Sequence, residues 1–317
     1  MPQAPLMPPA LMIGGPTCSG KSALAVALAE RLGGTVINAD SMQVYRELRI
    51  ITARPSPEEE ALVPHRLYGV RPAAEPGSVA WWRTEALSAM HEARLPILCG
   101  GTGLYLQSMT TGLADIPDPG PAREEARALL AQDGAASLHA RLEAADPATA
   151  AGLRPSDGQR IARAWEVWRS TGRGLSEWQR SAAPAAPFAF KLILLDPPRD
   201  GVRRAAETRF DAMLTAGALD EVRALLALEL DPALPAMRAH GVPELTPYLR
   251  GECDLAAART RAVQATTAYI KRQATWFRNR VIAEQTRTRI IHARFGECRQ
   301  FSEREQAEII AFIRAPG

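Results

Sequence analysis

The residues best suited to chemistry form one short stretch near the start of the chain, Gly15-Pro16-Thr17-Cys18-Ser19-Gly20-Lys21-Ser22. It fits the pattern G-x-x-x-x-G-K-[ST], in which backbone N–H groups surround phosphate oxygens and the following helix adds a favourable dipole. Lys21 would bring positive charge to the terminal phosphates, and the Ser22 hydroxyl would ligate Mg²⁺. The alternative is a chance glycine-rich turn, but an apolar run precedes the stretch and a helical segment follows it. We therefore expect this phosphate loop, residues 15–22, to bind a diphosphate or polyphosphate with Mg²⁺ as cofactor.

A second candidate lies at the end of the next predicted strand, residues 35–40, which finishes in Asp40. In open α/β sheets the residue after the carboxyl end of a strand faces the ligand crevice. Asp40 could therefore act near the phosphates as a base or in a metal shell. A helix or turn cap is the alternative, although the polar continuation through Arg46 is unusual for a cap.

A third apolar run, residues 96–99, leads into Gly100-Gly101-Thr102-Gly103-Leu104-Tyr105. A Walker B strand would end here in Asp or Glu, and this one does not, so a plain ATPase is disfavoured. The glycines permit close approach of the backbone to a ligand. Thr102 adds a hydroxyl.

The remaining elements follow from periodicity and from breakers. Strand signals vanish between residues 115 and 187, where helical spacing dominates and proline clusters mark both ends. Further elements are expected as a strand at 191–195, helices at 202–230 and 259–280, a strand at 289–292 and a helix at 303–313. We predict an α/β fold: a P-loop NTPase-like parallel sheet core flanked by helices, residues 10–114 and 188–317, with a mostly α-helical insertion domain, residues 115–187.

Two helical faces are basic. Gln159 and Arg163 share one face of the insertion, with Arg160 beside them, and this face could be solvated or could contact nucleic acid. The predicted helix 259–280 interleaves six basic residues with Tyr269, Trp276 and Phe277. That pattern suits an RNA backbone with stacked bases, and it equally suits packed aromatics with solvated arginines.

Composition indicates where in the cell the protein works. The chain has 317 residues and a net charge of +3, and its four cysteines form no C-x-x-C pair. One cysteine lies inside the phosphate loop, where a disulfide would disrupt it, so a reducing, cytoplasmic location is expected. The start lacks the basic and apolar regions of a signal peptide, and no apolar run approaches a membrane span, so we expect no membrane association.

Together, the motifs resemble the tRNA dimethylallyltransferase family, also called tRNA isopentenyltransferases. The matching segments appear in the family's order and cover roughly residues 11–280. They are the phosphate loop, Asp40-Ser41…Gln43-Val44-Tyr45, Thr52-Ala53-Arg54-Pro55, residues 100–105, Pro155-Ser156-Asp157…Gln159-Arg160-Ile161…Arg163-Ala164, Arg209…Met213…Gly217…Glu221-Val222 and Lys271-Arg272-Gln273…Thr275-Trp276-Phe277.

The resemblance implies transfer of the dimethylallyl group from dimethylallyl diphosphate to N6 of adenosine 37, next to the tRNA anticodon. It implies Asp40 as the base, with Arg209 and Thr17 also catalytic at the diphosphate. The insertion would grip the anticodon stem-loop of a tRNA bound by a monomer, and the target base would be extruded. The implied tRNA contacts are Asp40, Ser41, Met42, Gln43, Thr102, Arg123, Gln159, Arg160, Ile161, Ala162 and Arg163. Contacts around residues 238–243 stay open, because His240-Gly241-Val242 lacks the family's usual aromatic after the glycine.

Two other functions start from the same residues. A P-loop small-molecule kinase using ATP would share the first motif, and ATP could occupy the loop, but a kinase explains neither residues 100–105 nor residues 271–277. A nucleotide-dependent RNA-binding module leaves Asp40 and Arg209 without a role. Both are therefore weaker accounts of the chain.

Overall fold

The computed structural model describes residues 7–181, 183–296 and 302–315. The chain divides into two compact units, one formed by residues 1–110 and 186–317 and the other by residues 111–185. The smaller unit takes the place of the insertion that the sequence predicts at 115–187.

The larger unit is built on a six-stranded sheet whose order is β3-β2-β4-β1-β5-β6, with every neighbouring pair parallel. This confirms the α/β class predicted for the core. The strands are β1 Pro9–Gly14, β2 Thr35–Asn38, β3 His65–Arg66, β4 Pro96–Gly100, β5 Ala189–Leu195 and β6 Thr288–Ile291. Since β1, β2 and β4 are neighbours, the segments that follow them, the three predicted site segments, emerge at one edge of the sheet.

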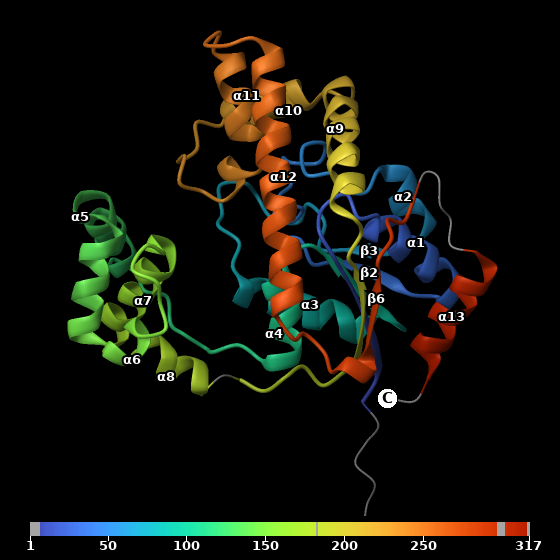
Figure 1. Cartoon of the computed structure of the whole chain (residues 1–317), viewed down its shortest axis with the longest axis horizontal. Coiled ribbons are helices and arrows are strands. Elements are labelled where there is room, and N and C mark those ends of the chain that lie inside the picture. The colour runs from blue at the N-terminus through green and yellow to red at the C-terminus, as the bar shows by residue number, and fades with distance from the viewer. Residues whose placement is uncertain (1–6, 182, 297–301, 316–317) are drawn as a thin grey trace, which may run out of the picture. The chain divides into compact units, whose positions relative to one another are not determined.

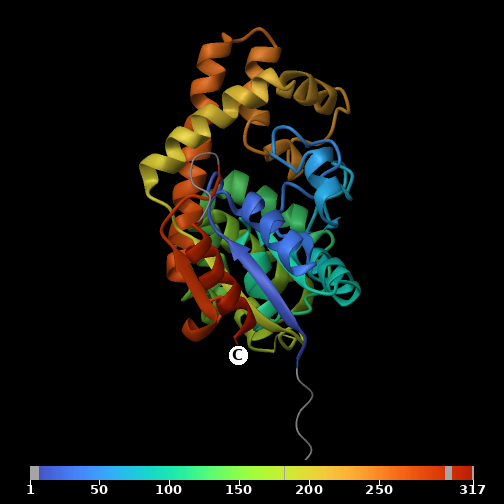
Figure 2. The same ribbon diagram turned by 90° about the vertical axis from the view of Figure 1, so that its right-hand side faces the viewer.

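The two faces of the sheet carry separate cores because side chains alternate along each strand. Leu11 and Ile13 of β1 belong to the core that includes helix α1 Lys21–Leu32 and Ile309 of helix α13 Glu303–Arg314. Met12 belongs to the opposite core, which contains helices α3 Val79–Glu92 and α4 Gly103–Thr111. The short helix α2 Pro57–Leu62 begins at a capping box on Ser56. Figure 2 shows α1 and α13 beside β1.

A group of helices extends from the core of the larger unit. It consists of α9 Arg199–Thr215, α10 Ala218–Leu226, α11 Val242–Leu249 and α12 Leu255–Asn279, with the short turns η1 Ala236–Arg238 and η2 Gln285–Arg287. The long helix α12 runs beside α9 and α11 (Figure 1).

The prediction of one helical stretch over 202–230 is wrong in one respect. The helix ends at Thr215, and α10 begins after Gly217, whose φ of 101° lies in the region that favours glycine. Phe210, Met213, Val222 and Leu225 are nevertheless buried, as their spacing indicates.

The regular elements described in the smaller unit are all helices, α5 Ala122–Ala145, α6 Pro147–Ala150, α7 Gly158–Thr171 and α8 Leu175–Arg180. The two helices predicted at 122–131 and 137–144 are joined in α5 but separated by Gly134, where φ is 77° and the helix is interrupted. Its core is formed where α5 packs against α7, with Leu138, Leu142 and Ile161 completely buried.

In the described ranges no helix has the length and apolar character needed to cross a bilayer.

Candidate active site

The phosphate loop follows β1 directly and ends in the first turn of α1, as its motif requires. Cys18 and Gly20 have left-handed backbones, with φ of 62° and 87°. The Lys21 ammonium donates to the carbonyl of Pro16 at 3.2 Å, so it folds back over the loop. The Ser22 hydroxyl lies close to the Cys99 thiol at the end of β4. Burial raises the pKa of that thiol to about 12, although the Ser22 hydroxyl slightly lowers it, so Cys99 stays protonated at neutral pH.

Asp40 is held at the carboxyl end of β2 by a buried asparagine. The Asn38 side chain accepts from the Asp40 N–H at 2.8 Å and donates to the carbonyl of Leu67 at 3.0 Å. The Met42 N–H donates to Asp40 Oδ1 at 3.0 Å, so this carboxylate does close a local turn, as the capping alternative supposed. The turn uses one oxygen and leaves Oδ2 to the site. Oδ2 lies 3.5 Å from where a Cβ on Gly101 would stand.

Charged and aromatic groups surround the Asp40 carboxylate. Burial lowers the pKa of Lys21, and Asp40 opposes that shift because a nearby negative charge favours the ammonium form. Burial raises the pKa of the Tyr269 phenol, and Asp40 adds to the rise. His240, whose ring lies 4.7 Å from that of Tyr269, has its pKa lowered by burial. The base candidate therefore shares its surroundings with a phosphate-loop lysine and with two rings from distant segments.

The glycine turn after β4 is tied to the Asp40 segment. Thr102 donates its N–H to the carbonyl of Ala39 at 3.2 Å, and its hydroxyl accepts from the Ser41 N–H at 2.9 Å. Thr102 and Ser41, both predicted to contact tRNA, therefore lie together in the larger unit.

Two side chains from the extended helices reach the phosphate loop. Arg209 of α9 donates to the Thr17 hydroxyl at 3.0 Å, which brings together two of the predicted catalytic residues. Gln273 of α12 accepts from the Thr17 N–H at 2.9 Å and donates to the carbonyl of Gly101 at 3.0 Å. A single buried amide thus joins the phosphate loop to the glycine turn.

Gln273 is the site residue that the sequence prediction left out. It stands inside a recognised motif, but nothing in that motif says what it contacts. The available signal is a glutamine at a buried position of an amphipathic helix, since buried amides require partners.

Gln43 and Met42, both predicted to contact tRNA, stabilise the segment that follows Asp40. The Gln43 amide donates to the carbonyls of Thr52 and Ala53 at 2.9 and 2.8 Å, and Met42 packs on the core. The Glu221 carboxylate accepts the N–H groups of residues 49, 50 and 51 at 2.7–2.8 Å. The segment after Asp40 is therefore fixed from both ends.

The candidates in the smaller unit are surface groups with acidic partners. Arg123 pairs with Asp118 at 3.0 Å, Arg160 with Asp157 at 3.4 Å and Arg163 with Glu166 at 3.1 Å, while Gln159 is exposed. Ile161 and Ala162 are corrected: they are 0% and 7% exposed in the core between α5 and α7, so their side chains pack and do not present a surface to RNA.

The protein side chains at the phosphate loop could bind Mg²⁺ only if the substrate supplied most of the ligands. In the described part of the chain no group of three or more His, Cys, Asp or Glu side chains could hold a metal ion. The Ser22 hydroxyl is an oxygen donor at the start of α1, and Mg²⁺ commonly takes few protein ligands and fills its sphere with phosphate oxygens and water. Ser22 therefore fits the predicted role.

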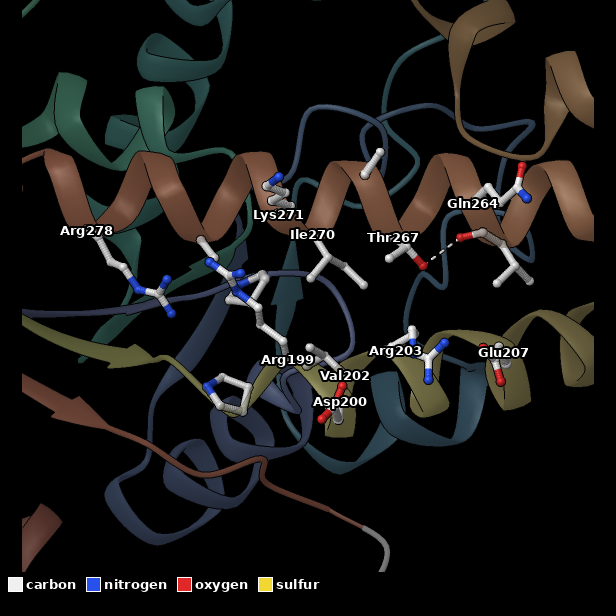
Figure 3. A pocket seen from close by; sticks show the side chains of 15 residues that line it. Arg199, Asp200, Val202, Arg203, Glu207, Gln264, Thr267, Ile270, Lys271 and Arg278 are labelled. Atoms are coloured by element: carbon white, nitrogen blue, oxygen red, sulfur yellow. Dashed lines mark hydrogen bonds between the residues drawn. The ribbon is translucent and has the colours of Figure 1, made fainter.

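A cavity of about 500 Å³ opens between α9 and α12 beside Pro16 of the phosphate loop. Figure 3 shows Arg199 and Arg203 on the α9 side and Lys271 and Arg278 on the α12 side, with Ile270 between the helices. Arg278 is paired with Asp196 at 2.7 Å. The lining is largely apolar and carries the acids Asp200 and Glu207 as well as the basic residues, so the cavity next to the phosphate loop suits an apolar group.

Comparisons with known proteins agree with this geometry. The sequence matches the family model described as IPP transferase over residues 43–280 and that described as isopentenyl transferase over residues 9–74. It is 62% identical to the tRNA dimethylallyltransferase of Granulibacter bethesdensis, covering 96% of this chain and 98% of that protein. It is 58% identical to the enzyme of the same name from Acidiphilium cryptum, covering 98% and 96%.

Solved structures are similar too. The tRNA isopentenylpyrophosphate transferase from Bacillus halodurans has 32% identity and a TM-score of 0.67, covering 96% of this chain and 95% of that one. A eukaryotic dimethylallyltransferase described as acting on tRNA has 27% identity and a TM-score of 0.72, covering 85% and 70%.

Proposed function

Since this chain belongs to the tRNA dimethylallyltransferase family, we propose that it moves the dimethylallyl group of dimethylallyl diphosphate to N6 of adenosine 37, next to the tRNA anticodon. The products are N6-dimethylallyladenosine and diphosphate. The observation that carries the proposal is the hydrogen bonding of Gln273, which joins a diphosphate-binding loop to the segment that faces a strand-end carboxylate.

Asp40 is the general base in this proposal. As the N6 amine attacks the allylic carbon, the bond from that carbon to the diphosphate oxygen breaks, and the amine must lose a proton. Oδ1 of Asp40 accepts the Met42 N–H, so we assign the proton to Oδ2, which faces the glycine turn. Asn38 accepts a hydrogen bond from the Asp40 N–H and so fixes the backbone that carries this carboxylate.

The phosphate loop binds the leaving diphosphate. Its backbone N–H groups, Lys21 and Arg209 are positive groups fixed before the charge develops, which is the condition for strong electrostatic stabilisation. An anion beside Lys21 favours its charged form against the effect of burial. The Ser19 hydroxyl is buried and has no hydrogen-bond partner among the described residues, and an oxygen of the diphosphate would satisfy it.

Ser22 would hold a Mg²⁺ ion together with the diphosphate oxygens. Bound Mg²⁺ would neutralise charge on the diphosphate as it leaves. The cavity beside Pro16 adjoins this site, and its largely apolar lining would suit the prenyl chain of the donor.

On the tRNA side, the adenine amine is unreachable while the base is stacked, so the base must be extruded. We propose that Ser41 and Thr102 lie near it and that Arg123, Gln159, Arg160 and Arg163 of the smaller unit contact the anticodon stem-loop. A tRNA substrate supports a cytoplasmic location. We also propose that the enzyme acts as a monomer, which sedimentation at working concentration would test.

The experiment is transfer of label. Purified protein is incubated with Mg²⁺, radiolabelled dimethylallyl diphosphate and an anticodon stem-loop that carries adenosine 37. We expect label in the RNA, no label when that adenosine is replaced by another base, and loss of transfer when EDTA removes Mg²⁺. Absence of label in the intact stem-loop would reject the proposal.

A further inference from the structure

The outer side of the phosphate loop is covered by a segment near the end of the chain. This strap, residues 294–296, follows β6, which pairs with β5 next to β1. Arg294 Nε donates to the carbonyl of Cys18 at 2.8 Å, and the Phe295 N–H donates to the carbonyl of Ser19 at 3.0 Å. A Cβ on Gly20 would lie 1.7 Å from the Phe295 carbonyl oxygen, so strap and loop are in direct contact.

These two bonds act on a strained part of the loop. Cys18 is a non-glycine residue with φ of 62°, a conformation that L side chains rarely adopt and that persists only when its surroundings enforce it. The Cys18 side chain packs against Val202 and Ile270, and its carbonyl is held by Arg294. The left-handed residue is thus fixed through both its side chain and its backbone.

Fixing the carbonyls also orients the N–H groups. A trans peptide is planar, and its C=O and N–H point in opposite directions. Because the Ser19 carbonyl points outward to Phe295, the N–H of Gly20 in the same peptide unit points to the inner side of the loop. The Ser19 N–H, which shares a peptide unit with the Cys18 carbonyl, donates to the Pro16 carbonyl at 3.3 Å and closes the turn. The Gly20 N–H is therefore the group that the strap turns toward an anion, in a loop whose backbone N–H groups bind anions.

The strap has anchors of its own. The Asp196 N–H, just past β5, donates to the carbonyl of Ile291 at 2.9 Å, and the Phe295 side chain packs on the core that contains α1. The position of Arg294 is therefore set by the sheet, independently of any ligand.

We propose that Arg294 is a positioning residue for the diphosphate: together with the Phe295 backbone it holds the phosphate loop in its anion-binding form before the donor arrives. Arg294 acts through the Cys18 carbonyl. The proposal rests on the proposed function, because it assumes a diphosphate in the loop.

The test compares Arg294→Ala with Arg294→Gln. Glutamine carries an N–H at the same number of bonds from the backbone as Arg Nε, so it keeps the donor and removes the charge. Arg289→Ala is the matched control, because Arg289 lies on β6 and pairs with Glu308 at 2.9 Å, away from the loop. For each variant we would measure the Kd of inorganic pyrophosphate with Mg²⁺ by calorimetry, KM and kcat for both substrates, and Tm.

For Arg294→Ala we expect pyrophosphate binding and the donor KM to worsen about tenfold, which corresponds to about 1.4 kcal/mol, with the tRNA KM and kcat changed less than about threefold. Arg294→Gln and Arg289→Ala should stay within about threefold of the parent.

A fall in Tm for Arg294→Ala with unchanged pyrophosphate binding would overturn the proposal, since the strap would then only stabilise the fold. Equal weakening in Arg294→Ala and Arg294→Gln would also overturn it, because charge and not the bond to Cys18 would be responsible. If the parent neither binds pyrophosphate nor transfers label, the proposed function itself fails, so the two failures are distinguishable.

Discussion

Around the phosphate loop, the polar side chains are half-buried and have partners from α9, α12 and the segment after β6. In the unit of residues 111–185, the candidate arginines have side chains that are 40–61% exposed and pair with acids close by in the sequence. The first arrangement fixes groups before substrate binds, as electrostatic catalysis requires. The second consists of surface ion pairs, which contribute little to stability and can be exchanged for phosphates. Substitutions should therefore have large effects on chemistry in the first region and small, salt-dependent effects on binding in the second.

The largest effect is expected at Asp40. Asp40→Asn keeps an oxygen for the Met42 N–H but removes the base, so single-turnover transfer should fall by about 10³-fold. The affinity for the stem-loop, measured by filter binding, should change less than about threefold, since the shape of the side chain is kept. Near-normal transfer by Asp40→Asn would remove Asp40 as the base.

The next effect is expected at Arg209, which reaches the loop through Thr17. Arg209→Ala should lower kcat/KM for the donor by about 10²-fold, the size seen when one electrostatic donor is removed from a reaction site. The control is Arg223→Ala on α10, where the arginine is exposed and pairs with Asp220. A loss in Arg209→Ala that appears only in the tRNA KM would contradict the assignment to the diphosphate.

A smaller effect is expected at Gln273, where catalysis and stability are coupled. Gln273→Ala leaves the Thr17 N–H and the Gly101 carbonyl without their partner, so the free energy of unfolding should fall by about 1–3 kcal/mol. Transfer should fall about tenfold, because the two sides of the site lose their link. Thr260→Ala, at an exposed position of the same helix that does not line the cavity, is the matched control. Unchanged transfer in Gln273→Ala under conditions where it is fully folded would show that the link has no role in the reaction.

The smallest effect is expected in the unit of residues 111–185, at Arg163. Arg163→Ala should weaken stem-loop binding by about threefold and reduce the slope of log Kd against log salt concentration by about 0.7–0.9, the value for one phosphate contact. Arg141→Ala, in the same unit and paired with Asp133 at 2.6 Å, is the control. An unchanged salt slope in Arg163→Ala would leave this arginine as a solvated surface group.

The elements that depend on local sequence patterns were predicted correctly. The phosphate loop and the strands β1, β2 and β4 follow from apolar runs that end in glycine or polar residues, and the tail strand and helix lie close to their predicted places. The strand β3 was missed because it has two residues, His65 and Arg66, and exists only through pairing with β2. The end of α9 was missed because apolar spacing continues across Gly217.

The candidate site was predictable as a set of residues but not as a set of contacts. Asp40, Thr17 and Arg209 were identified by motif, and the structure joins the last two. The link through Gln273 spans 256 residues, and a sequence pattern carries no information about such a pairing. Ile161 was assigned to tRNA because the family resemblance covers residues 159–163 as one motif, whereas its place on the helix puts its side chain in the core.

The residues that hold the phosphate loop also determine at which stage of synthesis and folding the site becomes complete. The loop leaves the ribosome early, but its partners Arg209, Gln273 and Arg294 lie 192, 256 and 276 residues further on. Contacts so distant in sequence form late in folding, because a long stretch of chain must close before they can form. A nascent chain truncated before Arg294 therefore carries the complete motif without its last support. On the proposals above, prenyl transfer requires nearly the whole polypeptide, and we expect proteolytic removal of residues 288–317 to weaken donor binding by the loop at the opposite end of the sequence.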